Sequence, residues 1–219
     1  MVEEPRAAIW DMDGVLVLSG DFHYEAWVET LRDYGLSMSR EQFEQTFGMN
    51  NQNLLRRIYG PRLRPEQIHE LADRKEARYR ELIRGRMQAL PGVEEWLQRL
   101  HDAGWRQAVA SSAPMANVAA VINQLDCWHF FDAVLTGERL PRSKPDPAIF
   151  LQAAAAVAVP PERCVVIEDG TVGVEAACRA GMRAIAVTTT HPASEFQEAD
   201  IIVERLNHLP PDSFDHLIG

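Results

Sequence analysis

The segment AAIWDMDG, residues 7–14, places four apolar residues directly before two aspartates and a glycine. An unbroken apolar run of this length is typical of a strand that is covered on both faces of a parallel sheet. Five further runs of strand length follow it, at residues 107–110, 133–135, 164–167, 184–187 and 201–203. Helical patterns with proline or glycine at their ends separate several of these runs. The alternation predicts an α/β fold built on a doubly wound parallel sheet.

The stretch from about Ser19 to Arg86 interrupts this alternation, because it contains no convincing strand. Apolar residues recur in it at helical spacing, and residues 68–83 have the pattern of a long charged helix. A wholly helical stretch placed after the first strand predicts a separate cap inserted into the main domain. We therefore expect a core of residues 1–17 and 88–219, and a helical cap of residues 18–87.

The composition limits the classes of partner. The chain has 219 residues, of which 46% are hydrophobic, and a formal net charge of -10 at pH 7. That charge repels nucleic acids and anionic membrane surfaces, so we expect neither as a partner. No apolar run approaches the ~18 residues of a membrane span, and the cysteines lack the spacing of a metal or redox motif. We expect a soluble cytoplasmic protein, a monomer or weak dimer, that acts on a small molecule.

Polar residues follow the predicted strands at their carboxyl ends, where ligands bind in open parallel sheets. These residues are Asp11 and Asp13 after the first strand, Ser111 and Ser112 after the second, and Glu168 and Asp169 after the fourth. Lys144 lies in a loop that precedes another predicted helix. Each feature alone has an ordinary structural explanation, such as a turn, a helix cap or a solvated side chain. Their convergence at one edge of the sheet indicates a single functional site.

These residue types suit phosphoryl transfer, in which a protein positions the reactants and neutralises negative charge. Asp11 can attack phosphorus as a nucleophile, and Asp13 can pass a proton to the leaving oxygen and later accept one. The carboxylates of Asp11 and Asp169 suit a magnesium ion, which prefers oxygen ligands. Lys144 and the Ser111 hydroxyl can hold phosphoryl oxygens. The set therefore favours a magnesium-dependent enzyme.

Four segments carry a resemblance to a known family. Asp11–Leu16, Ala110–Ser112, Lys144–Pro147 and Val166–Gly170 resemble the four motifs of the haloacid dehalogenase-like hydrolase superfamily. Leu90–Val93 is similar to the β-phosphoglucomutase-like branch of that superfamily, whose members have a helical cap. The resemblance implies a Rossmann-like core, a mobile cap that closes over the substrate, and bound Mg²⁺.

The same resemblance implies a set of metal ligands. They are the carboxylates of Asp11 and Asp169 and the backbone carbonyl of Asp13, with Glu168 in or beside the coordination sphere of the metal. Haloalkanoate dehalogenases share the nucleophile but lack an acid two residues after it, so Asp13 favours phosphate chemistry over dehalogenation.

The predicted cap carries a further resemblance. His23 and Lys75 match a histidine and a lysine of relatives, and Gly48–Asn51 resembles their second cap element. We expect His23, Asn51, Lys75 and Ser112 to be candidate substrate-binding residues. Sugar-phosphate mutases place an arginine where this chain has Asn51, and the loss of that cation disfavours binding of a second phosphate. The alternative for His23 and Lys75 is an ordinary packed or solvated helix residue.

Together these features predict hydrolysis of a small phosphate monoester, such as a sugar or polyol phosphate, through a phospho-Asp11 intermediate. Two alternatives stay open. One is a hexose-phosphate mutase of the β-phosphoglucomutase type, which must keep water away from the intermediate, whereas a phosphatase must admit it. The other is a binding or regulatory protein that has this fold without turnover.

Overall fold

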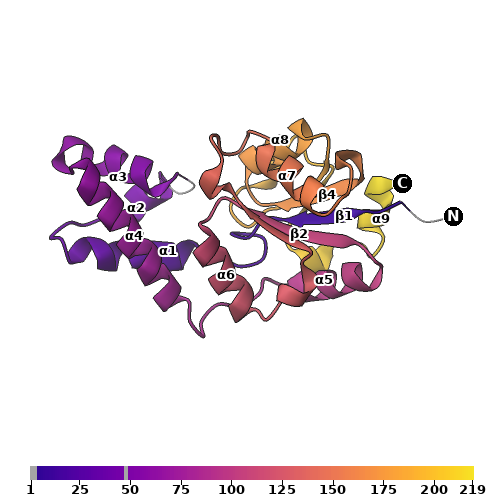
Figure 1. Ribbon diagram of the computed structural model, residues 1–219, viewed down its shortest axis with the longest axis horizontal. Coiled ribbons are helices and arrows are strands. Elements are labelled where there is room, and N and C mark those ends of the chain that lie inside the picture. Colours follow the sequence, from indigo (N-terminus) through magenta and orange to yellow (C-terminus); the bar gives the residue numbers. More distant parts are fainter. Residues whose placement is uncertain (1–3, 47–48) are drawn as a thin grey trace. The chain divides into compact units, whose positions relative to one another are not determined.

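The computed structural model describes residues 4–46 and 49–219, and its centre is a sheet of six parallel strands in the order β3-β2-β1-β4-β5-β6 (Figure 1). The strands are β1 (Ala7–Trp10), β2 (Arg106–Ser111), β3 (Ala133–Thr136), β4 (Cys164–Glu168), β5 (Arg183–Val187) and β6 (Ile201–Val203). Each of the six predicted runs forms a strand, and the doubly wound parallel sheet is confirmed. The order reverses direction at β1, which lies between β2 and β4. Ligand sites of open α/β sheets lie at such a switch point.

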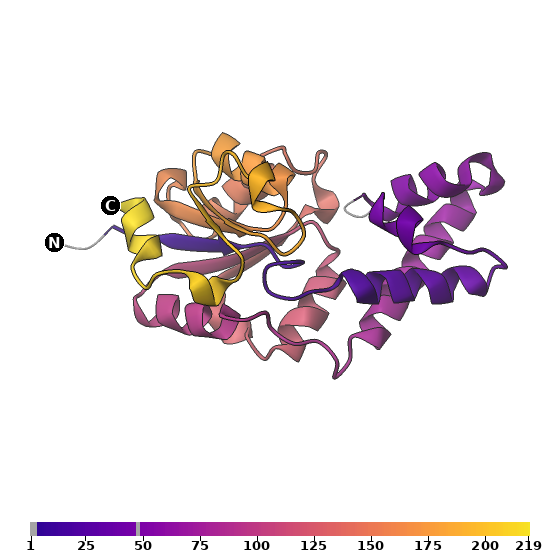
Figure 2. The same cartoon turned by 180° about the vertical axis from the view of Figure 1, so that it is seen from behind.

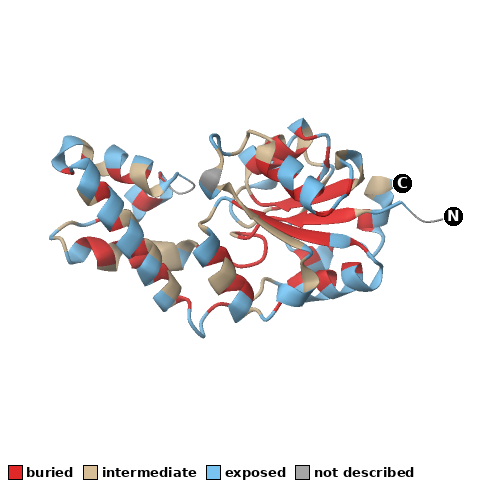
Figure 3. Ribbon diagram, in the orientation of Figure 1, coloured by how far each residue is buried: buried red, intermediate tan, exposed pale blue. Residues whose placement is uncertain are grey.

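Helices cover both faces of the sheet, which explains why the strands are apolar throughout. One face is covered by α7 (Ala148–Ala156) and α8 (Thr171–Arg179), and the other by α5 (Val93–Asp102), α6 (Met115–Gln124) and α9 (Ser213–Ile218) (Figure 1). Short 3-10 turns occur at Gly60–Arg62, Trp128–Phe130, Gly137–Arg139, Pro161–Arg163, Ala193–Glu195 and Leu206–His208. Figure 3 shows the buried residues concentrated in the central strands and on the inner faces of the helices.

The chain divides into two compact units, Met1–Leu18 with Met87–Gly219, and Ser19–Arg86. The second unit is an inserted, all-helical domain made of α1 (Gly20–Arg32), α2 (Arg40–Glu44), α3 (Asn51–Tyr59) and α4 (Pro65–Leu82). Figure 2 shows α4 crossing α1 obliquely, and the two helices form the most extensive contact within this insert. Trp27, Leu31, Leu55 and Leu71 belong to a hydrophobic core of the insert that is distinct from the core beside the sheet.

Among residues 4–46 and 49–219, every helix is too short or too polar to cross a bilayer.

A buried polar side chain links the sheet to α5. Gln107 on β2 is 0% exposed, and its Oε1 accepts a hydrogen bond of 3.1 Å from Trp10 Nε1 on β1. Its Nε2 donates to the Leu97 backbone carbonyl of α5 at 2.9 Å. A buried polar group is tolerated when its hydrogen bonds are made, and here both ends of the amide are paired.

Replacing Gln107 by leucine keeps the volume and removes both hydrogen bonds. We expect the free energy of unfolding to fall by about 1–3 kcal/mol, because the Trp10 N–H loses its partner inside the core. Urea denaturation of the wild type and of Gln107→Leu measures the difference. The control is the exposed Gln98→Leu on α5, for which we expect a change of at most about 0.5 kcal/mol. Equal effects of the two substitutions would contradict the role assigned to Gln107.

Candidate active site

Three carboxylates meet where β1 and β4 end. Trp10 pairs with Ile167 in the parallel ladder, and the Asp11 backbone N–H donates to the Ile167 carbonyl at 3.0 Å. This register places Asp11 beside Glu168, the last residue of β4, and Asp169 follows directly. Ligand oxygens of Asp11, Glu168 and Asp169 lie within 4.8 Å of one another, and all three residues are buried. The sheet thus brings together three predicted site residues that are up to 158 positions apart in sequence.

Lys144 supplies a positive charge to these acids. Its Nζ donates to Asp11 Oδ1 at 2.6 Å and makes a short ion pair with Glu168 Oε1, and its side chain is buried. Burial alone lowers the pKa of Lys144, but the neighbouring Asp11 and Glu168 carboxylates outweigh burial and raise that pKa above its ordinary value. Lys144 is therefore a permanently charged member of the cluster.

Backbone groups hold Glu168 in place. Its Oε2 accepts hydrogen bonds of 3.0 Å from the backbone N–H groups of Asp169 and Gly170. Gly173 on α8 packs directly against this carboxyl group, since a Cβ atom there would lie 2.0 Å from Glu168 Oε1. One oxygen of Glu168 thus faces the backbone and the other faces Lys144.

Asp169 lies against the turn that follows β1. The nearest atom to a Cβ built on Gly14 would be Asp169 Oδ2, at 1.9 Å, and Gly14 has a positive φ of 83°. Only glycine satisfies both the backbone conformation and this close approach. On its other side, the Thr190 hydroxyl donates to Asp169 Oδ2 at 2.7 Å.

Burial and mutual repulsion raise the pKa values of two of these acids. Burial, followed by the Glu168 charge, raises the pKa of Asp11 to about 7, although Lys144 opposes the shift. Burial and the charges of Glu168 and Asp11 raise the pKa of Asp169 to about 8. Buried carboxylates at such short range resist ionisation together unless a cation compensates them. Their oxygen donors suit a divalent cation such as Mg²⁺, so these residues fit the implied metal.

The other predicted residues of the core lie at the same sheet edge. Ser111 ends β2 and is buried, and its Oγ accepts the Ala113 backbone N–H at 3.1 Å. Ser112 is exposed. Asp13 is half-buried in the turn after β1, where its backbone pairs with that of Val17.

The insert contains a second polar cluster. Lys75 Nζ lies 2.8 Å from His23 Nδ1 and 2.9 Å from Glu76 Oε1, and Asn51 Nδ2 donates to the same Glu76 oxygen at 2.6 Å. The His23 ring stacks on Tyr79 with ring centroids 4.0 Å apart. Burial and then the Lys75 charge lower the pKa of His23 well below its ordinary value. The structure therefore groups His23, Asn51 and Lys75 within the insert, while Gly48 of the predicted motif lies outside the described residues.

Sequence reasoning missed Glu76 and Thr190. Glu76 follows Lys75 in a helix rich in charges, and nothing in that pattern separates it from its neighbours. Thr190 could have been found, because it lies shortly after the fifth predicted strand, where the other strands are followed by site residues.

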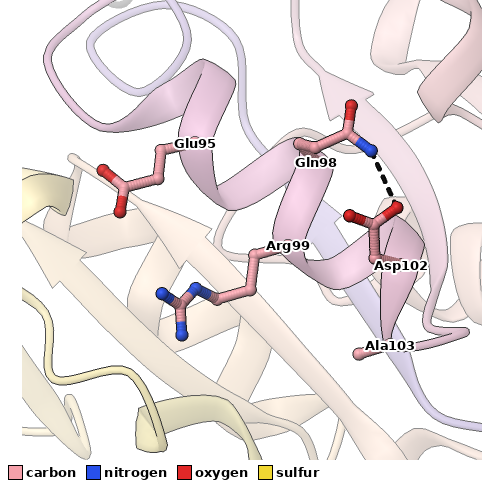
Figure 4. Close-up of a pocket in the computed structure, with 5 residues that line it drawn as sticks. All are labelled: Glu95, Gln98, Arg99, Asp102 and Ala103. Atoms are coloured by element: carbon pink, nitrogen blue, oxygen red, sulfur yellow. Dashed lines mark hydrogen bonds between the residues drawn. The ribbon is translucent and has the colours of Figure 1, made fainter.

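A separate hollow of about 580 Å³ lies on the surface of α5, and Figure 4 shows the side chains that line it. Its lining residues are Glu95, Gln98, Arg99, Asp102 and Ala103. All of them belong to one helix and the residue after it, and Gln98 Nε2 donates to Asp102 Oδ1 at 2.8 Å. No predicted site residue is among them, so the buried acids and Lys144 form the candidate active site.

Replacement of Gly14 tests the close packing of the turn on Asp169. We expect Gly14→Ala to displace the Asp169 carboxylate and to abolish Mg²⁺ binding, measured by isothermal titration calorimetry. The matched control is Gly104→Ala, because Gly104 also has a positive φ, of 74°, but has no atom within 4 Å of the added Cβ. Both variants should lose about 1–2 kcal/mol of stability from backbone strain. Unchanged Mg²⁺ affinity in folded Gly14→Ala would contradict this packing role.

The raised pKa values predict how stability depends on pH. Asp11 and Asp169 bind protons more tightly in the folded protein than in the unfolded chain. The stability that this proton binding contributes is fully present below pH 3.8, the ordinary pKa of aspartate. It is lost as the pH rises through the folded-state pKa values of about 7 and about 8. We expect the free energy of unfolding of EDTA-treated protein to decrease as pH rises from about 4 to about 8. Asp11→Asn should reduce this slope and the exposed Asp212→Asn should preserve it, as measured by urea denaturation across that range. A slope unchanged by Asp11→Asn would contradict the assignment.

Comparisons with known proteins agree with this geometry. The family model of haloacid dehalogenase-like hydrolases matches residues 5–181. Hexitol phosphatase B of Escherichia coli strain K12 is 31% identical over 208 residues, which is 93% of this chain and 93% of that protein. The chloroplastic 5-amino-6-(5-phospho-D-ribitylamino)uracil phosphatase of Arabidopsis thaliana is 28% identical over 204 residues. That match covers 92% of this chain but 55% of the plant protein, so the chain spans about half of its length.

A solved structure extends the similarity to the whole fold. The β-phosphoglucomutase from Clostridium difficile superposes with a TM-score of 0.85 at 25% sequence identity, covering 98% of this chain and 97% of that chain. The family match spans the buried acids, Lys144 and the helical insert together. The chain therefore belongs to the haloacid dehalogenase-like hydrolase family.

Proposed function

We propose that this protein is a Mg²⁺-dependent phosphatase that hydrolyses a sugar or polyol phosphate through a phosphorylated Asp11. The observation that carries the proposal is the buried group of Asp11, Lys144, Glu168 and Asp169 at the carboxyl edge of the sheet, with Asp13 two residues beyond Asp11. Family membership supports the same chemistry, and relatives in this family include phosphatases named for small phosphorylated substrates.

Mg²⁺ would be held by Asp11, Asp169 and the Asp13 backbone carbonyl, with Glu168 in or beside the coordination sphere. When bound, it would compensate the buried carboxylates and the phosphoryl charge. Burial and the neighbouring carboxylates raise the pKa values of Asp11 and Asp169, and a bound cation would favour the ionised form of both acids.

The first chemical step transfers the phosphoryl group to the protein. A carboxylate oxygen of Asp11 forms a bond to phosphorus while the ester P–O bond breaks, and the leaving alkoxide takes a proton from Asp13. Lys144, which already lies 2.6 Å from Asp11 Oδ1, orients the nucleophile and stabilises the charge on the phosphoryl oxygens. Ser111 and Ser112, at the end of β2, bind the same oxygens.

The second step regenerates the carboxylate. Asp13, now ionised, takes a proton from a water molecule as the water oxygen bonds to phosphorus. The P–O bond to Asp11 breaks, its electron pair returns to the Asp11 carboxylate, and inorganic phosphate leaves. A sugar hydroxyl in place of water would give a mutase instead, so the choice depends on which acceptor reaches the intermediate.

The insert of residues 19–86 serves as the cap that selects the substrate. Its His23, Asn51, Lys75 and Glu76 form a continuous hydrogen-bonded group. The amide, imidazole, ammonium and carboxylate groups of this cluster can donate and accept hydrogen bonds with the hydroxyls of a sugar or polyol. By resemblance, Asn51 stands where sugar-phosphate mutases have an arginine, and the loss of that cation supports a phosphatase over a bisphosphate-dependent mutase.

Phosphate release from a panel of sugar, polyol and nucleotide monophosphates tests the proposal. We expect Mg²⁺-dependent release concentrated on a few sugar or polyol phosphates. Asp11→Asn should abolish release because the nucleophile is lost, and Asp13→Asn should lower kcat by about 10²–10⁴-fold because proton transfer is lost.

The surface variant Asp212→Asn serves as the matched control and should keep the wild-type kcat. Isomerisation of β-glucose 1-phosphate with little phosphate release would show that the protein is a mutase and not a phosphatase. Full activity in Asp11→Asn would contradict the assignment of Asp11 as the nucleophile. The absence of both turnover and metal binding would contradict the proposed enzyme and favour a binding protein.

A further inference from the structure

Two consecutive threonines in the loop after β5 reach the candidate active site. The Thr189 hydroxyl makes a 2.5 Å hydrogen bond to the backbone carbonyl of Gly14, in the turn after β1. The Thr190 hydroxyl donates to Asp169 Oδ2 at 2.7 Å and lies 2.8 Å from the Asp169 backbone carbonyl. The loop thus contacts both segments that carry the acids, Asp11 to Gly14 and Glu168 to Asp169.

This loop is anchored independently of the site. The backbone N–H of Thr188 donates to the Val203 carbonyl of the adjacent strand β6 at 2.9 Å. The anchor fixes where the two following hydroxyls point, because they lie one and two residues beyond it. Asp169 and the Gly14 carbonyl therefore receive these hydrogen bonds from a segment held by the sheet.

The contacts around Asp169 restrain its carboxylate on two sides. Gly14 lies against Oδ2 so closely that a Cβ atom would sit 1.9 Å away, and the Thr190 hydroxyl bonds to the same oxygen. Thr190 engages Oδ2 and not Oδ1. A carboxylate with one oxygen tethered has a defined rotamer and presents its second oxygen in a fixed direction.

A purely structural role for Thr190 would predict a packed side chain. Thr190 is instead exposed as a residue, so its methyl group contributes little to the core. Its hydroxyl carries a single proton, which is shared between the backbone carbonyl and the carboxylate of Asp169. Loss of the hydroxyl therefore affects the orientation of Asp169 far more than the stability of the fold.

We infer that Thr190 is a positioning residue that acts through Asp169: its hydroxyl tethers Oδ2 and so sets the affinity of the acid cluster for a divalent cation. Thr189 has the complementary task of holding the Gly14 turn against Asp169. The inference rests on the proposed metal site, and it adds a residue of the loop after β5 to a site whose other members lie at the ends of β1, β2 and β4 or in the Lys144 loop.

Direct metal binding tests the inference without relying on turnover. We would titrate Mn²⁺ into EDTA-treated wild type, Thr190→Val, Thr190→Ser and Thr188→Val, and follow free Mn²⁺ by electron paramagnetic resonance. Valine keeps the shape of threonine without the hydroxyl, whereas serine keeps the hydroxyl. We expect Thr190→Val to weaken Mn²⁺ binding by at least about 10-fold, and Thr190→Ser and the Thr188→Val control to bind close to the wild-type affinity.

The thermal midpoint of each metal-free variant separates positioning from folding. We expect Thr190→Val to unfold within about 2 °C of the wild type, because the exposed side chain contributes little packing. Wild-type affinity in folded Thr190→Val, or a loss in Thr190→Ser equal to that in Thr190→Val, would overturn the role of the hydroxyl. Wild-type protein that binds no Mn²⁺ would instead overturn the proposed metal site, so the two failures are distinguishable.

Discussion

The burial of three carboxylates beside a single ammonium group is the constraint on which the rest of this site depends. Asp11, Glu168 and Asp169 lie within 4.8 Å of one another, and Lys144 pairs with two of them. Mutual repulsion would separate these acids in a flexible loop, so the parallel sheet must hold them by its backbone. The backbone of β1 and β4 therefore keeps together acids whose charges would otherwise drive them apart.

Close packing around the acids comes from residues that lack a side chain. Gly14 accommodates the Asp169 carboxylate and Gly173 accommodates the Glu168 carboxyl group, each at distances that exclude a Cβ atom. The remaining restraints are backbone N–H groups on Glu168 and threonine hydroxyls on Asp169 and Gly14. Such preorganised contacts suit catalysis, because the dipoles do not have to reorganise during the reaction.

The insert also contains a buried lysine beside polar side chains. Lys75 is buried against Glu76 and His23, just as Lys144 is buried against Asp11 and Glu168. The contacts of Lys75 come from one carboxylate and one imidazole, whereas Lys144 pairs with two carboxylates. The core site has three carboxylates beside Lys144, and this excess of negative charge accords with metal binding there.

The strands and the order of the polar residues that follow them could be predicted from sequence, because unbroken apolar runs and short-range motifs are local properties of the chain. The helical character of residues 19–86 could also be predicted in this way. Tertiary structure alone decided that Lys144 pairs with Asp11 and Glu168, that Glu76 joins Lys75 to Asn51, and that Thr190 tethers Asp169. These pairings depend on strand register and loop paths that bring distant residues within 3 Å, and no local pattern in the sequence encodes them.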